Sequence, residues 1–374
     1  MFILVLPIFV LILFLLISFL VAKRNKIVSL LIAVCCTAVI FIPFRAYKIA
    51  LLDPGLKKAI QEDVILKTKK IFIPQYPGAY NPSIIPYEDG YLLSFRVKSY
   101  NFLTLLKKIS NVRTSYLGFV KLNKNFEISG EPYLLDLQSN TSPGFTGFAQ
   151  DARLFRFQDQ ILLIYNDYGS CRARSCYSLF VTEMVEKEGR LVQKSPSRLL
   201  AYDKMISIEK NWAPFEFEGN LYLIYSGEPH LILKVDLETG VCKQEACTDV
   251  NFQWKWGIIR GGTPALPAEG QLFALFHSSF ETPAYSFFGK TRGRNYAMGA
   301  YLLRNGYPFT PIKVTPYPIA SLDDYTEDNR RKVLFPGGMV IEGNKIHVVW
   351  GKNDSSILIS TLDREKLFSS MVSI

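Results

Sequence analysis

A polar residue begins each of several apolar segments in this chain, and these residues could carry chemistry. Asn81, Asp151 and Lys210 each lie eight or nine residues before a tight turn, and Gly261 and Phe335 hold the same place in two further segments. A carboxylate can exchange a proton, an amide can bind hydroxyls, and a compact ammonium group can bind phosphate. The recurring position predicts that the three polar side chains meet at one site.

The segments that must position these residues have the pattern of β-hairpins. Each has an extended run, a tight turn and a strand rich in Leu, Ile, Tyr and Phe; the turns contain Gly90, Asp159, Gly219, Gly270 and Gly343. Two further strands fit into each unit, and we expect such strands over 115–122, 177–185, 230–237 and 296–303. Five units of about four strands indicate an all-β fold, a five-bladed β-propeller over residues 70–374. An irregular pair of β-sandwiches is the alternative.

In a propeller the first strand of each blade lines the central channel, so residues that begin these strands face one another. We therefore expect Lys210, Asn211 and Trp212 at the mouth of this channel. Trp212 could stack on the apolar face of a sugar ring, and a buried core indole is the alternative. Arg260 enters a tight glycine turn whose backbone amides could bind an anion.

The first 44 residues contain two uncharged apolar segments, 2–22 and 27–44, separated by the basic stretch KRNK. A bilayer span needs about 20 apolar residues, so the pair predicts a transmembrane helical hairpin. We thus divide the chain into a membrane anchor (1–50), a linker (51–69) and the propeller (70–374). The first segment lacks a basic start and a small-residue cleavage site, which favours an anchor over a cleaved signal peptide. KRNK would lie in the cytosol, although the basic residues after the second segment favour the opposite orientation.

Four cysteines beyond the apolar segments form two pairs of equal spacing, Cys171 with Cys176 and Cys242 with Cys247. Each pair could close a short loop as a disulfide, which would place the propeller in a lumen, in a periplasm or outside the cell. A four-cysteine zinc site and free thiols in a cytosolic domain are the alternatives. Zinc spacings are usually tighter, and the chain has only three histidines, so we expect no metal site.

The segments around the candidate residues resemble glycoside hydrolase family 130. The similar motifs are Asn81-Pro82-Ser83 with Arg96, Asp151-Ala152-Arg153, Lys210 before a Phe-rich hairpin, and FPGGMVIEGNKIHVVWGKND, which ends at Asp354. Their order agrees with the family over roughly residues 75–360. The family comprises β-mannoside phosphorylases and some hydrolases on a five-bladed propeller, and the related family 108 glycosyltransferases make β-1,2-mannosides.

The resemblance implies a role for each matching residue. Asp151 would be the general acid of an inverting displacement, acting in the phosphorylases through a sugar hydroxyl. Arg153 would hold Asp151 or meet an anion, and Asn81, Arg96 and Asp354 would bind the sugar. Lys210 would bind phosphate or a nucleotide-sugar phosphate. From their own positions, at the channel mouth and in the glycine turn, we expect Asn211 to bind the sugar and Arg260 to bind phosphate. His277 matches a histidine of the family at a strand end, with a purely structural histidine as the alternative.

The chain also departs from the family pattern. Gln150 and Ala152 replace the Glu and Pro of the family's Glu-Asp-Pro-Arg motif, and Tyr225-Ser226 stands where the phosphorylases have His-Arg. The second departure weakens phosphorolysis and leaves mannosyl transfer or hydrolysis open. The first supports an alternative function, a non-catalytic glycan-binding propeller. A glycoside hydrolase of another five-bladed class is a further alternative, which would need two or three carboxylates at the mouth.

The net charge and the absence of several motifs limit which partners and cofactors we expect. The formal charge of +10 could attract acidic lipid headgroups or anionic glycans, and we expect no nucleic-acid partner for an anchored domain. The chain has no Walker loop, no dinucleotide fingerprint and no HExxH motif. The sequence therefore predicts a membrane-anchored enzyme that acts on β-mannoside oligosaccharides or glycans. We expect no cofactor, with inorganic phosphate or a nucleotide sugar as a possible co-substrate.

Overall fold

The computed structural model describes residues 48–50, 62–98, 115–139, 148–171, 174–250, 254–286, 289–321 and 333–374. The chain divides into two compact units. The smaller unit comprises Met1–Asp53, Glu281–Arg294 and Thr326–Arg331, and within it β1 (Lys48–Ala50) pairs antiparallel with the end of β19 (Gln271–Ser286). The larger unit holds the rest of the chain, including every residue of the candidate site.

Four of the five sheets of the described residues lie wholly in the larger unit, and three of these follow one another along the chain. The first has the strand order β3 (Tyr80–Tyr87), β4 (Gly90–Lys98), β5 (Ser115–Leu122) and β6 (Tyr133–Leu134). The second has β7 (Gln150–Phe157), β8 (Gln160–Cys171), β9 (Arg174–Lys187) and β10 (Arg190–Gln193), with β11 (Arg198–Leu199) beside β9. The third has β13 (Ala213–Phe217), β14 (Asn220–Ser226), β15 (His230–Val235), β16 (Val241–Thr248) and β12 (Ala201–Tyr202).

The two remaining sheets complete the fold. In the fourth, which is eight-stranded, β19 pairs with β1, β17 (Ile258–Gly261), β18 (Leu266–Ala268) and β20 (Gly289–Leu303), and β20 pairs with β21 (Pro311–Val314) and β22 (Ala320–Ser321). Strand β26 (Val372–Ser373) pairs with β21. The fifth has β23 (Leu334–Glu342), β24 (Lys345–Lys352), β25 (Ser356–Asp363) and β2 (Ile65–Ile71). A short 3-10 helix, η1 (Glu62–Val64), precedes β2, and α5 (Arg364–Ser370) follows β25.

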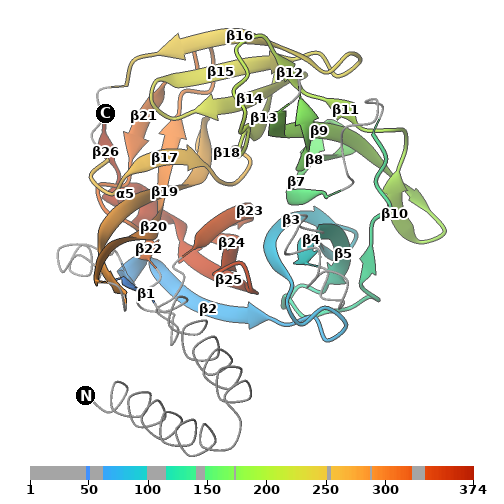
Figure 1. Ribbon diagram of the computed structural model, residues 1–374, viewed down its shortest axis with the longest axis horizontal. Helices are drawn as coiled ribbons and strands as arrows, with labels where there is room; N and C mark the ends of the chain where they lie inside the picture. The colour runs from blue at the N-terminus through green and yellow to red at the C-terminus, as the bar shows by residue number, and fades with distance from the viewer. Residues whose placement is uncertain are drawn as a thin grey trace, which may run out of the picture. The chain divides into compact units, whose positions relative to one another are not determined.

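The sheets of the larger unit are arranged around a common centre, with β3, β7 and β23 nearest to it (Figure 1). Neighbouring inner segments touch through glycines that leave no room for a side chain. A Cβ atom on Gly261 would collide with the carbonyl of Asn211, and one on Gly337 would collide with the carbonyl of Pro82. The arrangement is therefore all-β and propeller-like, and four of the five sheets have the four or five strands of a blade.

The five predicted hairpins are present, and their turns explain why the chain folds locally in this way. In all five the first turn residue has a positive φ: Glu88 at 51°, Gln158 at 51°, Glu218 at 48°, Glu269 at 50° and Gly343 at 54°. Two-residue turns with positive φ match the twist of paired strands, and the glycines that follow Glu218 and Glu269 take the second position without a steric cost. The predicted outer strands correspond to β5, β9, β15 and β20.

Apolar side chains fill each space between consecutive sheets. The described residues form five buried clusters, and each takes residues from two neighbouring sheets. One of them joins Ile84 and Leu93 of the first sheet to Val349 and Ile357 of the fifth. Burying one such side chain contributes about 1.5–3 kcal/mol, so these five clusters hold the larger unit together as a closed ring.

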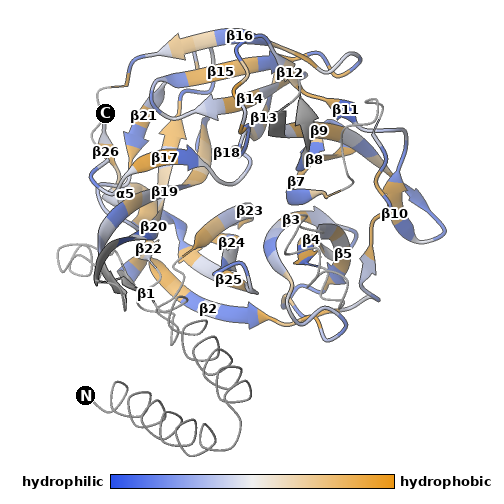
Figure 2. Ribbon diagram, viewed as in Figure 1, coloured by the Kyte–Doolittle hydropathy of each residue, from blue (hydrophilic) through white to orange (hydrophobic). Residues whose placement is uncertain are grey.

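Strand β2 completes the fifth sheet, and it begins within the segment that the sequence analysis assigned to a linker. Strand β2 is the outer strand of the fifth sheet, with Ile65 opposite Leu362 and Ile71 opposite Ile357. Figure 1 shows β2 beside β25, the two ends of the chain's colour range side by side, and Figure 2 shows that β2 is largely hydrophilic, as an outer strand can be. The propeller-like unit therefore includes part of the predicted linker 51–69, because β2 begins at Ile65.

The predicted membrane spans, 2–22 and 27–44, lie outside the described residues. Within the ranges given above, no helix is long and apolar enough to cross a bilayer.

The predicted disulfide between Cys242 and Cys247 is wrong, because both thiols are free. The two residues lie on the single extended strand β16, where five positions span roughly 16 Å, whereas a disulfide needs Cα atoms within about 7 Å. The other predicted pair, Cys171 and Cys176, belongs to the hairpin of β8 and β9. Their side chains lie outside what the structure describes, so that disulfide stays a prediction.

Two buried histidines should make the stability of the fold depend on pH. Burial lowers the pKa of His230 from its ordinary 6.5 to about 4, and burial together with nearby cations lowers that of His277 to about 3. Both histidines are neutral in the folded chain, whereas both bind a proton in the unfolded chain below pH 6.5. Their contribution to the free energy of unfolding is therefore complete above pH 6.5 and is lost as the pH falls from 6.5 towards 4. We expect His230 alone to account for about 3 kcal/mol of the loss in urea unfolding between pH 7 and pH 4.

The same urea series on His230→Gln provides the comparison. The variant should show a shallower dependence of unfolding free energy on pH than the wild-type chain over this range. Equal slopes for the two proteins would show that His230 is not held neutral by the fold.

Candidate active site

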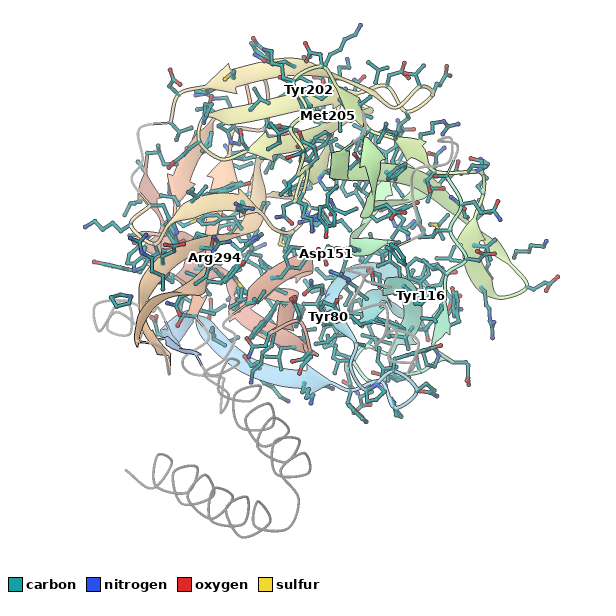
Figure 3. The ribbon with its side chains drawn as sticks, viewed as in Figure 1. Tyr80, Tyr116, Asp151, Tyr202, Met205 and Arg294 are labelled. Atoms are coloured by element: carbon teal, nitrogen blue, oxygen red, sulfur yellow. The ribbon has the colours of Figure 1, made fainter. Side chains whose placement is uncertain are left out.

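Asp151 is the centre of a buried cluster at the start of β7. Its Oδ1 atom accepts hydrogen bonds from Asn81 Nδ2 at 2.8 Å and from Arg96 Nη1 at 2.9 Å. Asn81 is the second residue of β3 and Arg96 lies near the end of β4, so two adjacent strands of the first sheet hold a carboxylate of the second sheet. Figure 3 shows Asp151 close to the centre of the ring of sheets. The structure thus brings together three of the residues that the sequence predicted.

Unusual backbone conformations place these side chains. Asn81, Asp151 and Asn211 have φ values of 46°, 51° and 66°, in the left-handed region where Asn and Asp are the common non-glycine residues. In β3 and β7 the strand register also shifts at this place, between Tyr80 and Ser83 and between Gln150 and Arg153. A bulge re-aims a side chain, and backbone strain of this kind clusters at functional sites.

The charges around Asp151 keep it ionised. Burial by itself would raise the pKa of this carboxyl. The positive charges of Arg96 and Lys210 and the hydrogen bonds from Asn81 and Arg96 outweigh burial and lower the pKa to about 2. At neutral pH Asp151 is therefore a carboxylate in an ion pair with Arg96, whose own pKa is raised by the negative charges of Asp151 and Asp354 despite burial. A resting carboxylate can accept a proton but has none to donate.

Arg153 ties the inner strands to one another. Its side chain is 1% exposed, and Nε donates to the carbonyl of Gly262 at 2.8 Å. Its Nη atoms donate to the Asp151 carbonyl at 3.3 Å, to Asn211 Oδ1 at 3.4 Å and to the Gly261 carbonyl at 3.3 Å. Burial lowers its pKa to about 10, which still leaves it charged at neutral pH.

Lys210 and Arg260 supply two more cations from neighbouring sheets. Lys210 is half-buried, with Nζ 3.6 Å from the centre of the Tyr177 ring, and its charge acts on Asp151. Arg260 is exposed and lies opposite His277 in the pairing of β17 with β19. Burial, and then the positive charges of Arg153 and Arg260, lower the pKa of His277 to about 3. His277 is thus a neutral imidazole in a positive field.

The cluster has more positive than negative charge. The groups that interact electrostatically with Asp151, Arg96 or His277 include four cations, Arg96, Arg153, Lys210 and Arg260, and two carboxylates, Asp151 and Asp354. Four minus two leaves a net charge of +2, with Arg96, Arg153 and Asp151 buried, Lys210 and Asp354 half-buried and Arg260 exposed. Such a surplus is unfavourable unless an anion offsets it, so the arrangement suits a phosphate group.

Three polar atoms of the cluster are buried and have no hydrogen-bond partner among the described residues. They are Asn81 Oδ1, Arg96 Nε and His277 Nδ1. Buried polar atoms are nearly always paired in native proteins. Together they offer one acceptor, one donor and one imidazole nitrogen, a set that matches the hydroxyls of a sugar.

Asp354 and Trp212, both predicted to contact the sugar, lie in different environments. Asp354 is half-buried, has a φ of 52°, and acts on Arg96 through its charge, so it belongs to the cluster. Trp212 does not: it is 1% exposed, packs in a core cluster and donates from Nε1 to Glu209 at 3.2 Å. The predicted stacking of a sugar on Trp212 is wrong, and its indole is the core residue that the sequence left as the alternative.

Some residues of the site were missed in the sequence. Phe335 lies under the guanidinium of Arg153, with the ring centre 5.1 Å from Cζ, and its ring also contacts His277. The ring of Tyr80 lies 5.1 Å from Cζ of Arg96. Gly351 approaches the side chain of Asn81 so closely that a Cβ would collide with Oδ1. Phe335 did stand at the recurring position, and Gly351 in the last motif, but neither residue type indicates polar chemistry.

The described residues offer little for a metal. No three His, Cys, Asp or Glu side chains among them lie together in a group that could hold an ion. A cavity of about 590 Å³ lies between β2 and residues 126–132, and none of the predicted site residues lines it.

Comparisons with known proteins agree with the propeller-like fold. A family model described as β-1,4-mannooligosaccharide phosphorylase matches residues 60–372. No curated protein matches the sequence. Similar solved structures include β-1,2-mannobiose phosphorylase from Listeria innocua in complex with β-1,2-mannobiose (16% identity, 86% of this chain and 98% of that chain, TM-score 0.53). Another is MPT-4, a mannose phosphorylase from Leishmania mexicana in complex with phosphate (12% identity, 83% of this chain and 92% of that chain, TM-score 0.55). A third is a putative glycoside hydrolase from Parabacteroides distasonis (15% identity, 87% of this chain and 99% of that chain, TM-score 0.55). At these identities the structural likeness shows the fold alone.

Proposed function

Since the chain belongs to glycoside hydrolase family 130, we propose that it exchanges a mannosyl unit between a β-mannoside and phosphate, with Asp151 moving the proton. The observation that carries this proposal is the net charge of +2 of a cluster that already includes the ionised Asp151. A sugar hydrolase needs no such surplus, because water is neutral. An incoming or leaving phosphate does need it.

In the cleavage direction, a phosphate oxygen attacks the anomeric carbon as the glycosidic C–O bond breaks. The bonding electrons go to the leaving oxygen, which takes a proton from protonated Asp151 directly or through a sugar hydroxyl. Lys210, Arg260 and Arg153 would hold the phosphate. Asn81, Arg96, Asn211, His277 and Asp354 would hold the sugar. In the synthetic direction each step reverses, and ionised Asp151 accepts the proton of the acceptor hydroxyl.

Binding of phosphate would prepare Asp151 for cleavage. Lys210 is one of the two cations that lower the pKa of Asp151. A phosphate bound to Lys210 offsets that charge and repels the carboxylate, so the pKa of Asp151 rises when the site is full. The resting ion pair with Arg96 would then loosen only in the loaded enzyme.

Gly351→Ala should test whether Asn81 positions Asp151. The new Cβ would push Asn81 Oδ1 and so disturb the 2.8 Å hydrogen bond to Asp151. We expect kcat/KM for mannoside phosphorolysis to fall by about 10- to 100-fold, since a displacement near 1 Å can cost that much. Gly130→Ala is the matched control, because its Cβ would meet only the side chain of Lys121, at 3.2 Å. A Gly351→Ala enzyme as fast as the control would remove Asn81 from this role.

A glycan-binding protein without activity is the second candidate. The observation in its favour is the low pKa of Asp151, which together with Gln150 and Ala152 fits a carboxylate fixed in a structural ion pair. Such a protein would bind mannosides through the same hydroxyl contacts and release them unchanged.

The deciding assay uses the full chain with β-mannosides plus inorganic phosphate, and separately with GDP-mannose plus mannose acceptors, with products identified by mass. Mannose 1-phosphate is the expected product of the first mixture. An elongated acceptor from GDP-mannose would indicate a transferase instead, and free mannose alone a hydrolase. Mannoside binding without any product would favour the glycan-binding protein.

Two further proposals concern the architecture around this site. We propose that β18, β19, β20 and β21 of the eight-stranded sheet form a blade, which gives the propeller five blades; an experimental structure would test this count. We also propose that the segments 2–22 and 27–44 anchor the chain in a membrane, with the propeller in a lumen, in a periplasm or outside the cell.

Cys247 provides a test of this location, because its thiol is free and exposed. A membrane-impermeant maleimide should label wild-type chains in intact cells more strongly than Cys247→Ser chains. If the difference appears as soon as the plasma membrane alone is permeabilised, with internal membranes left intact, the propeller faces the cytosol; if it appears only after internal membranes are opened too, the propeller lies in a lumen.

A further inference from the structure

Tyr177 joins the second sheet to the segment that carries Lys210. It lies on β9, and its backbone forms a parallel bridge with Ile208. Its amide donates to the carbonyl of Ser207 at 3.0 Å, and its carbonyl accepts from the amide of Glu209 at 3.0 Å. These bonds involve only the backbone, so they hold the segment beside β9 whatever side chain stands at position 177.

Side chains anchor the same segment close to Lys210. Asn166, buried on β8, donates from Nδ2 to the carbonyl of Glu209 at 2.7 Å. The carboxylate of Glu209 accepts from the Ile206 amide at 2.6 Å and from Trp212 Nε1 at 3.2 Å. The backbone that leads to Lys210 is thus fixed, and the place of its ammonium depends on a flexible four-carbon side chain.

The ring of Tyr177 lies against this ammonium. Nζ of Lys210 is 3.6 Å from the ring centre, whereas the other cation–ring contacts of the described residues are 4.6 Å or longer. A cation over a ring face is attracted to the ring, and more strongly where water is partly excluded, as it is around these two half-buried side chains. The contact therefore favours the side-chain conformation in which the charge of Lys210 acts on Asp151.

An aromatic ring suits this task at an anion site. A carboxylate in its place could also hold the ammonium, but its negative charge would oppose phosphate, whereas the ring leaves the positive charge in force. The ring covers one side of the ammonium, whose three N–H donors can still reach a ligand on the other side. A lysine that is already held loses less conformational freedom when phosphate arrives, so it binds phosphate more tightly.

We propose that Tyr177 is a positioning residue that sets the affinity for phosphate, because its ring holds the ammonium of Lys210 beside Asp151 before phosphate binds. Tyr177 acts through Lys210 and does not itself bind the phosphate. The inference rests on the proposed function, which takes Lys210 as a ligand of phosphate.

The test titrates the full chain with inorganic phosphate and, separately, with methyl β-mannoside, and measures both affinities by calorimetry. Tyr177→Leu removes the aromatic face, and Tyr177→Phe keeps it. Lys210→Met, alone and combined with Tyr177→Leu, shows whether the tyrosine acts through the lysine. The matched control is Phe72→Leu, because Phe72 is an exposed ring 5.8 Å from Nζ of Lys70, at the cavity that no predicted site residue lines.

We expect Tyr177→Leu to weaken phosphate binding by about 3- to 30-fold, the usual range for a partly shielded cation–ring contact. Tyr177→Phe and Phe72→Leu should bind phosphate within about 2-fold of the wild-type chain, and all three variants should bind methyl β-mannoside within the same limit. In the Lys210→Met chain, Tyr177→Leu should cause no further loss of phosphate affinity.

Unchanged phosphate affinity in Tyr177→Leu or in Lys210→Met would overturn the inference. An equal loss in Tyr177→Phe, or an equal loss of mannoside affinity in Tyr177→Leu, would also overturn it, since either would show a merely structural role. If the wild-type chain binds no phosphate, the inference and the proposed function fail together. If phosphate binding follows the expected pattern but phosphate and a β-mannoside yield no mannose 1-phosphate, the inference is supported and only the proposed function fails.

Discussion

Asp151→Asn is expected to lower kcat/KM for mannoside phosphorolysis by about 10²- to 10⁴-fold, the usual contribution of a positioned acid or base. Asparagine has the same shape and can still accept the hydrogen bonds of Asn81 and Arg96, but its amide cannot transfer a proton. The change also leaves the buried charge of Arg96 without its ion-pair partner, which should cost about 3 kcal/mol of stability. Initial rates and thermal melting of the same preparation would separate the two effects.

Asp159→Asn is the matched control for this change. Asp159 is an exposed carboxylate in the turn of the same hairpin, so neither its rate nor its melting temperature should differ from the wild-type chain. If Asp151→Asn keeps wild-type rates, Asp151 is not the proton-transfer group. If the wild-type chain and both variants bind mannoside equally and none makes product, the glycan-binding function is the better description.

Replacement of Arg153 by methionine should have the largest effect on stability. Methionine fills part of the volume but leaves the carbonyls of Gly261 and Gly262 and Oδ1 of Asn211 without their donor in a buried place. Each unpaired acceptor costs about 1–3 kcal/mol, so we expect a loss of about 3–5 kcal/mol. At this chain length that corresponds to a fall in melting temperature of roughly 6–12 °C, measured by calorimetry on the full chain.

Arg156→Met separates this effect from a general loss of positive charge. Arg156 lies on the same strand, is exposed, and donates a single hydrogen bond, to the Pro86 carbonyl at 3.2 Å. Its replacement should change the melting temperature by less than about 2 °C. A similar drop in both variants would mean that the network of Arg153 does not hold the inner strands together.

The hairpins could be predicted from the sequence because their signals are local. A turn such as Glu218-Gly219 and the apolar strand after it lie within a few residues of each other. Most of β2, residues 65–69, was assigned to a linker because ILKTKKI alternates only weakly and because its partner β25 is far away in the sequence. The pairing that makes it a strand is therefore not visible in any local pattern.

The positions of residues in the candidate site could be predicted from the sequence, but the ionisation state of Asp151 could not. Counting back from the turns found Asn81 and Asp151, whose backbones do share one conformation. The third member of this set is Asn211 rather than Lys210, because only Asn211 has a positive φ. The ionised state of Asp151 depends on Arg96 and Lys210, which come from other sheets, and such couplings through space have no trace in the local sequence.

The pairing of β2 with β25 also sets an order of events while the ribosome makes the chain. β2 emerges early, and its partner follows almost 300 residues later, which takes roughly 15–60 s at common elongation rates. Until then the other sheets can assemble, but the ring stays open and β2 has no neighbour. Chains translated side by side on one messenger could meet in this interval, and β2 of one nascent chain could then complete the last sheet of another. Fast elongation and well-spaced ribosomes should therefore raise the yield of correctly closed monomers.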